Sequence, residues 1–251
     1  MENRSNPAAM WDERFSQAEP VYGEQPNGYL RAQVQRLARG ASVLVPGDGY
    51  GRNGLWLAKQ GFRVHTVDLS PIGVERARNS ARDASLSLTI EQADLSTWAW
   101  PQNQFDAVFS IFVHLFPNVR SAIHANMLRA LGCVGVVTNG AVRNLEVARE
   151  LKLQMFAGNF SVSHAFAHVF DFGGPVVVGQ MKVKPGDLLH GDRNGVQTVP
   201  IEIAQKIPAV AQRMLGEERK IVEFCQSNDF TLEKLRSAVN ELRIKRENLE
   251  D

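Results

Sequence analysis

The chain has 251 residues, enough for one large α/β domain or two small ones, and its 44% hydrophobic content can form a proper core. The 28 Lys and Arg nearly balance the 27 Asp and Glu, so no overall field favours nucleic acid, and no apolar run approaches the ~20 residues that span a bilayer. Only two cysteines, Cys133 and Cys225, are present, so we expect no disulfide framework and no cysteine-based zinc site, but reduced thiols in a cytoplasmic protein without a signal peptide.

From Ala41 onward, short β-rich runs alternate with segments of helical pattern. We predict strands at 42–45, 63–67, 88–91, 105–112 (buried on both faces) and 133–138, and helices at 53–59, 72–84 and 121–131. This alternation favours an α/β fold with a Rossmann-like parallel sheet and right-handed crossovers in the N-terminal half. Residues 154–200 then indicate a β-rich segment, and residues 201–250 indicate C-terminal helices.

The most informative motif is VLVPGDGYGRNG, residues 43–54, in which a predicted strand runs into Gly47, Gly49 and Gly51 before a helix begins. Glycines at this point let the backbone turn sharply and approach a ligand closely. Asp68 and Asp94 follow the second and third predicted strands, where carboxylates can meet the ribose and adenine parts of a nucleoside. The same glycines also fit a dinucleotide fingerprint, and tight turns without a ligand are a third reading, so the loop alone leaves the cofactor open.

Six ordered motifs decide between these readings by resemblance: WDERF, YGEQPN, GDGYGRNG, VDLSPIGVERAR, QADLSTWAW and FDAVFSIFVHL. Together they resemble class I methyltransferases of the tellurite-resistance and thiopurine group. The resemblance implies S-adenosylmethionine as cofactor, bound by Gly47, Gly49, Gly51, Asp68 and Asp94, with Trp11 in a lid over it. Val45 stands where this family often has an acidic residue, and Asp48 in the loop is the acid that we assign to the cofactor instead.

Methyl transfer from a sulfonium releases a neutral thioether, so alignment and desolvation matter more than acid–base catalysis. We therefore assign no catalytic base. His114, just beyond the fourth predicted strand, is placed to face a small-molecule substrate, although a capping or structural role is an equal alternative.

The second half carries different motifs, HANMLRALGCVGVVTNGAVRNLEVAREL and VKPGDLLHGDRNGVQTVP among them. They resemble the regulators of ribonuclease E activity and the related 4-hydroxy-4-methyl-2-oxoglutarate aldolases. In those aldolases an Arg–Asp pair after GAV binds an oxo-acid and a metal; here Arg143 is kept as a substrate-binding residue, but Asn144 replaces the carboxylate, and an amide is a poorer ligand for a hard metal ion. His164 and His168 have the spacing of helical metal ligands but lack a third ligand nearby, so we predict no metal site.

The chain is thus interpreted as two truncated domains, residues 1–123 and 124–251, joined within the helix predicted at 121–131. The strand at 133–138 either becomes a fifth strand of the parallel sheet or leaves both halves partly uncovered, in which case the second half favours a homo-oligomer. Methyl transfer to a small soft nucleophile is the leading hypothesis. The alternatives are a metal-dependent oxo-acid lyase and a non-catalytic interaction module of the ribonuclease-regulator type.

Overall fold

The computed structural model describes residues 7–162 and 173–247, so His164 and His168 lie outside the described residues. The chain forms two compact units, Met1–Ala165 and Phe166–Asp251. The predicted domain boundary at 123/124 falls inside helix α5 (Pro117–Ala130) and remains a prediction.

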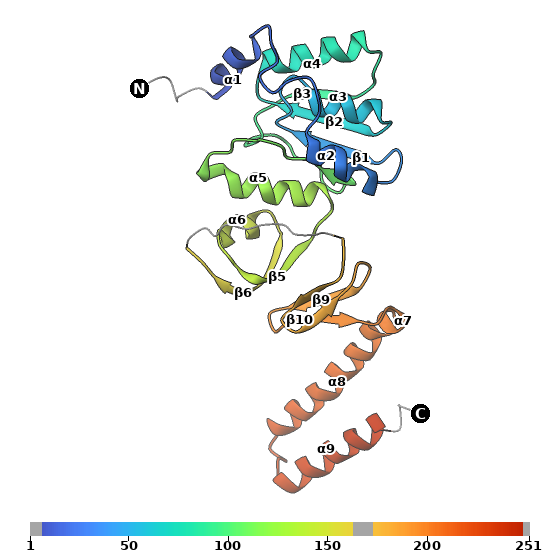
Figure 1. The fold of residues 1–251 in the computed structure, drawn as a ribbon. Helices are drawn as coiled ribbons and strands as arrows, with labels where there is room; N and C mark the ends of the chain where they lie inside the picture. Colours follow the sequence, from blue (N-terminus) through green and yellow to red (C-terminus); the bar gives the residue numbers. More distant parts are fainter. Residues whose placement is uncertain (1–6, 163–172, 248–251) are drawn as a thin grey trace. The chain divides into compact units, whose positions relative to one another are not determined.

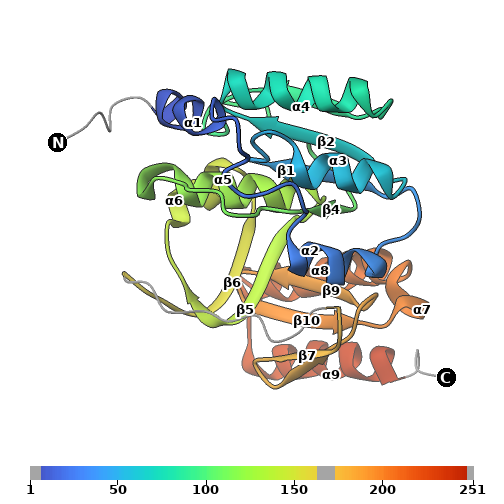
Figure 2. The ribbon, with the colours of Figure 1, turned by 45° about the horizontal axis from the view of Figure 1, so that its top comes forward.

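The first unit is built on a parallel sheet of four strands in the order β3-β2-β1-β4; β1, β2 and β3 are labelled in Figure 1 and β4 in Figure 2. The strands are β1 (Ser42–Pro46), β2 (Arg63–Asp68), β3 (Thr89–Gln92) and β4 (Ala107–Val108). Helices α3 (Arg52–Lys59) and α4 (Pro71–Asp83) connect the first three strands. The α/β, Rossmann-like prediction is therefore confirmed.

Alternate side chains of β1 point into two cores, one on each face of the sheet. Val43 and Val45 pack with Leu57 of α3 and with Leu30 of α2 (Gly28–Gln33). Leu44 packs with residues of α5 on the opposite face. A strand buried on both faces needs apolar residues at every position, which explains the continuous run at 43–45.

The fourth strand is shorter than predicted. Only Ala107 and Val108 pair with β1, whereas 105–112 was expected as a strand buried on both faces. β4 is an edge strand of the described sheet and its residues are half-buried. The chain leaves the extended conformation by Phe112, whose φ of +56° no strand can accommodate.

The strand predicted at 133–138 forms β5 (Gly135–Val142), but it does not join the parallel sheet. In the described part of the chain it pairs with β6 (Gln154–Phe160), in parallel, and the short helix α6 (Leu145–Glu150) connects the two (Figure 2). Of β5 and β6 only Val142 is buried, so this pair is largely uncovered, as the second of the two expected arrangements requires.

The second unit contains two antiparallel hairpins followed by the C-terminal helices that the sequence predicted. The hairpins are β7 (Val176–Val178) with β8 (Met181–Val183), and β9 (Leu188–Asp192) with β10 (Gly195–Val199); the helices are α7 (Ile201–Ala204), α8 (Ile207–Cys225) and α9 (Leu232–Glu247). Helices α8 and α9 contact each other. Within the described ranges, no helix combines the length and the apolar character that a membrane span requires.

Candidate cofactor and substrate site

The loop between β1 and α3 is shaped by glycines with positive φ. Gly47 and Gly49 have φ of +69° and +57°, which an L-residue with a Cβ rarely adopts. A Cβ would lie 2.8 Å from Cγ2 of Val113 at Gly47, and 2.6 Å from Cζ of Phe15 at Gly49. Both positions therefore require glycine for the neighbouring segments to close over the loop.

Asp68 connects the end of β2 to this loop. Its Oδ2 accepts a hydrogen bond from the Gly49 N–H at 2.7 Å, and its Oδ1 accepts one from the Ser70 N–H at 2.9 Å. Burial raises the pKa of the Asp68 carboxyl, while these two hydrogen bonds act in the opposite direction. Each carboxylate oxygen has a second lone pair, so Asp68 can still accept hydrogen bonds from a ligand.

Asp48 caps the first turn of α3. Its carboxylate accepts hydrogen bonds from the Gly54 N–H at 2.8 Å and from the Asn53 side-chain amide at 3.1 Å. Burial raises the pKa of Asp48 from 3.8 to about 7, and the nearby Asp68 adds to the rise. Asp48 thus holds the loop in place, and its contact with a cofactor stays a prediction.

Asp94 follows β3 and is exposed. Its Oδ1 accepts hydrogen bonds from the Ser96 N–H at 2.8 Å and from the Ser96 hydroxyl at 2.7 Å. Because β2 and β3 are neighbouring parallel strands, Asp68 and Asp94 reach the same edge of the sheet.

The N-terminal helix α1 (Pro7–Phe15) places two stacked rings, Trp11 and Phe15, beside the loop, with centroids 5.5 Å apart. Two polar contacts attach this helix to α4: the Ser70 hydroxyl donates to the Asp12 carboxylate, and Arg76 Nη1 donates to the Phe15 carbonyl at 2.6 Å. The helix is therefore held over the loop by side chains from the start of α4.

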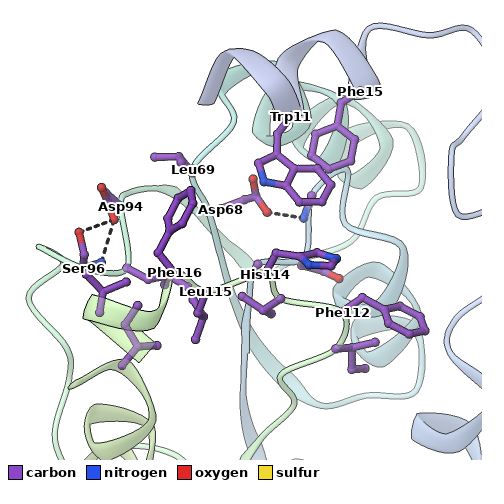
Figure 3. A pocket seen from close by; sticks show the side chains of 18 of the residues that line it. Trp11, Phe15, Asp68, Leu69, Asp94, Ser96, Phe112, His114, Leu115 and Phe116 are labelled. Atoms are coloured by element: carbon purple, nitrogen blue, oxygen red, sulfur yellow. Dashed lines mark hydrogen bonds between the residues drawn. The ribbon is translucent and has the colours of Figure 1, made fainter. Parts of the chain in front are cut away.

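One cavity collects most of the predicted site residues (Figure 3). It is lined by Trp11, Gly47, Asp48, Gly49, Asp68, Asp94 and His114, together with Phe15 and Tyr22. The His114 ring lies 6.0 Å from the Trp11 ring, centroid to centroid. The acidic, aromatic and backbone groups of the expected cofactor and substrate site are thus brought together from six segments of the chain.

Two predicted residues lie outside the cavity lining, Gly51 and Arg143. Gly51 has a φ of +86°, and a Cβ there would lie 2.8 Å from Cβ of Ala77, so its role is close packing of α3 against α4. Arg143 follows β5, and the adjacent Asn144 donates its side-chain amide to the Ser121 hydroxyl. The structure therefore does not join the Arg143–Asn144 pair to the other site residues.

Sequence reasoning missed several cavity residues, among them Arg52, Phe112, Phe116 and Asn118. Three of them belong to the stretch between β4 and the first turn of α5. Their position after a predicted strand could have indicated them, because segments that follow parallel strands meet at the edge of the sheet where ligands bind. Only His114 was selected from that stretch.

Two known families match different parts of the chain. The methyltransferase domain family matches residues 43–135, and the Aldolase/RraA family matches residues 119–197. The two matches overlap at residues 119–135, which include most of α5.

Individual relatives match only parts of the chain. A thiopurine S-methyltransferase of Gluconobacter oxydans is 37% identical over 82 residues, 32% of this chain and 37% of the relative. A protein of Halalkalibacterium halodurans named for 4-hydroxy-4-methyl-2-oxoglutarate aldolase is 29% identical over 75 residues, 30% of this chain and 36% of the relative. A solved TehB-like methyltransferase from Corynebacterium glutamicum has 29% identity and a TM-score of 0.38, with coverage of 57% of this chain and 79% of that one.

The chain spans less than half the length of the curated relatives it matches. Its N-terminal half nevertheless carries a methyltransferase domain, a family that implies S-adenosylmethionine as methyl donor, and its C-terminal half carries an Aldolase/RraA-like domain.

Proposed function

We propose that this protein transfers a methyl group from S-adenosylmethionine to a small soft nucleophile. The observation that supports the proposal is the single cavity shared by the glycine loop, Asp68, Asp94 and Trp11. In this proposal Asp68 accepts hydrogen bonds from the ribose hydroxyls, Asp94 lies beside the adenine, and Trp11 covers the cofactor.

The bound cofactor supplies the electrophilic methyl group, and the chain supplies position and a dry environment. Displacement of a neutral thioether requires the nucleophile to lie in line with the methyl group, so orientation and exclusion of water carry most of the catalysis. The rings of Trp11 and His114 lie beside the cavity and can exclude water there. His114 is proposed to contact the acceptor rather than to remove its proton.

Calorimetric titration with S-adenosylhomocysteine tests cofactor binding. We expect binding by the wild type and a loss of about tenfold in Asp94→Ala, on the order of the ~1.4 kcal/mol of one good hydrogen bond. Asp94 suits the test because it is exposed and its removal leaves the core intact. Asp83→Asn, a change of an exposed carboxylate at the end of α4, is the matched control. Absence of heat at millimolar ligand, or equal affinity of Asp94→Ala and wild type, would refute the proposal.

We also infer that the C-terminal half mediates self-association. None of the residues of α7, of α8 or of α9 up to position 242 is buried, and α8 exposes Leu215 and Val222 by 61% and 53%. Apolar side chains exposed along one helix favour burial against another protein surface. Light scattering after size-exclusion chromatography is expected to give a mass of two or more chains, reduced in Leu215→Glu. A wild-type mass of one chain at all concentrations would contradict this inference.

A further inference from the structure

Phe112 combines an unfavourable backbone with an exposed ring. Its φ of +56° lies in the left-handed region, where a bulky residue is an outlier. Burial of the ring contributes little free energy to offset this strain, because Phe112 is 63% exposed. Strained residues of this kind cluster at ligand sites, and Phe112 does line the cavity.

A second aromatic ring lies against the Phe112 ring. The Phe112 ring stacks on the Tyr22 ring, with centroids 6.2 Å apart and planes inclined by 18°. Arg52 fixes Tyr22 in turn, because its guanidinium lies 5.6 Å from the Tyr22 ring centroid and Nη1 donates to the Tyr22 carbonyl. The same Nη1 lies 3.4 Å from the Gln25 carbonyl, so this cationic side chain is directed toward backbone carbonyls.

A second exposed ring lines the same cavity. Phe116 is 53% exposed, and Figure 3 shows Phe112 and Phe116 on opposite sides of His114. Covering two open rings with an apolar ligand removes apolar surface from water. A charged ligand group placed against these rings would lose hydration, and the rings themselves offer it no hydrogen-bond partner.

Building on the proposed methyl transfer, we propose that Phe112 is a specificity-determining residue for the methyl acceptor. Its left-handed backbone holds the ring, backed by Tyr22, as an apolar wall of the acceptor subsite. The acceptor therefore carries an uncharged, apolar body next to its nucleophilic atom.

The test uses the full chain saturated with S-adenosylhomocysteine, so that no methyl transfer occurs, and two probe thiols. Phenylmethanethiol has an apolar body and 3-mercaptopropionate has a charged one. Calorimetry is expected to show at least tenfold tighter binding of phenylmethanethiol, and a loss of about tenfold for this thiol in Phe112→Ala. Affinity for S-adenosylhomocysteine should stay within twofold of wild type.

Three variants separate the ring from the backbone. Phe112→Gly removes the ring and relieves the left-handed strain, so it should bind phenylmethanethiol as weakly as Phe112→Ala. Phe112→Leu keeps apolar bulk and should restore part of the affinity. Tyr29→Ala removes a ring that is also 63% exposed but lies outside the cavity lining, and it should bind like wild type.

Equal binding of the two thiols, no binding of either, or wild-type affinity in Phe112→Ala would overturn the assignment of Phe112. A failure of the wild type to bind S-adenosylhomocysteine would instead refute the proposed methyl transfer, so the two failures are distinguishable.

Discussion

The buried carboxyl of Asp48 predicts an unusual dependence of stability on pH. Its pKa is raised from 3.8 to about 7, mainly by burial, so the folded state binds this proton more tightly than the unfolded state does. The corresponding stabilisation is complete below about pH 3.8 and is lost as the pH rises through about 7. Asp48→Asn, which does not titrate, should abolish this contribution.

The magnitude follows from the pKa in the folded state. Each pH unit in which only the folded state is protonated contributes about 1.4 kcal/mol. Between pH 5.5 and pH 8, the free energy of unfolding of the wild type should therefore fall by about 2 kcal/mol more than that of Asp48→Asn. The comparison of slopes is informative because asparagine also replaces one acceptor oxygen by a donor, which changes the stability by a similar amount at every pH.

Urea denaturation at a series of pH values, without ligand, measures this difference. Asp83→Asn, which changes an exposed carboxylate, should keep the wild-type dependence on pH. Curves for wild type and Asp48→Asn that run parallel to within about 0.5 kcal/mol would show that Asp48 is not protonated in the folded state near neutral pH.

Three further substitutions test the packing around the cavity by chemical denaturation. Gly49→Ala places a Cβ 2.6 Å from Phe15 Cζ at a positive φ and should cost about 2–4 kcal/mol; a change below about 0.5 kcal/mol would contradict the close packing. Ser70→Ala removes the hydroxyl that accepts the Gly73 N–H at 3.0 Å and should cost about 1 kcal/mol, whereas an unchanged midpoint would mean that α4 has no functional cap there. Leu44→Ala, at a fully buried position in β1, should cost about 2–5 kcal/mol, and a smaller loss would place Leu44 outside the core.

The sequence predicted the regular parts of the first unit closely. The strands β1 and β2 and the helices α3 and α4 begin and end within one or two residues of the predicted ranges. These elements have clear apolar patterns separated by turn residues, and Asp68 and Asp94 lie at or just after the ends of strands that are easy to recognise. The cavity residues among them were therefore predictable.

The remaining features depend on tertiary geometry. The run at 105–112 has the composition of a buried strand, but the left-handed conformation of Phe112 has no sequence signal, since nothing in its residue type favours a positive φ. β5 pairs with β6, the next strand along the chain, rather than joining β1–β4, and apolar composition alone does not decide between these arrangements. Arg143 was predicted from a family motif, and its place after β5 separates it from the cavity that the other residues line.

The location of the buried apolar side chains determines which parts of the protein unfold locally in solution and which unfold only with the whole first unit. Over residues 8–162 and 173–242, the buried hydrophobic residues all lie between Phe15 and Leu153. Two-stranded hairpins such as β9–β10 gain little stability on their own, so their amide protons should exchange with solvent at low free-energy cost. Amides of β1 and β2, by contrast, should exchange only when the whole first unit unfolds, which gives a single polypeptide two levels of protection.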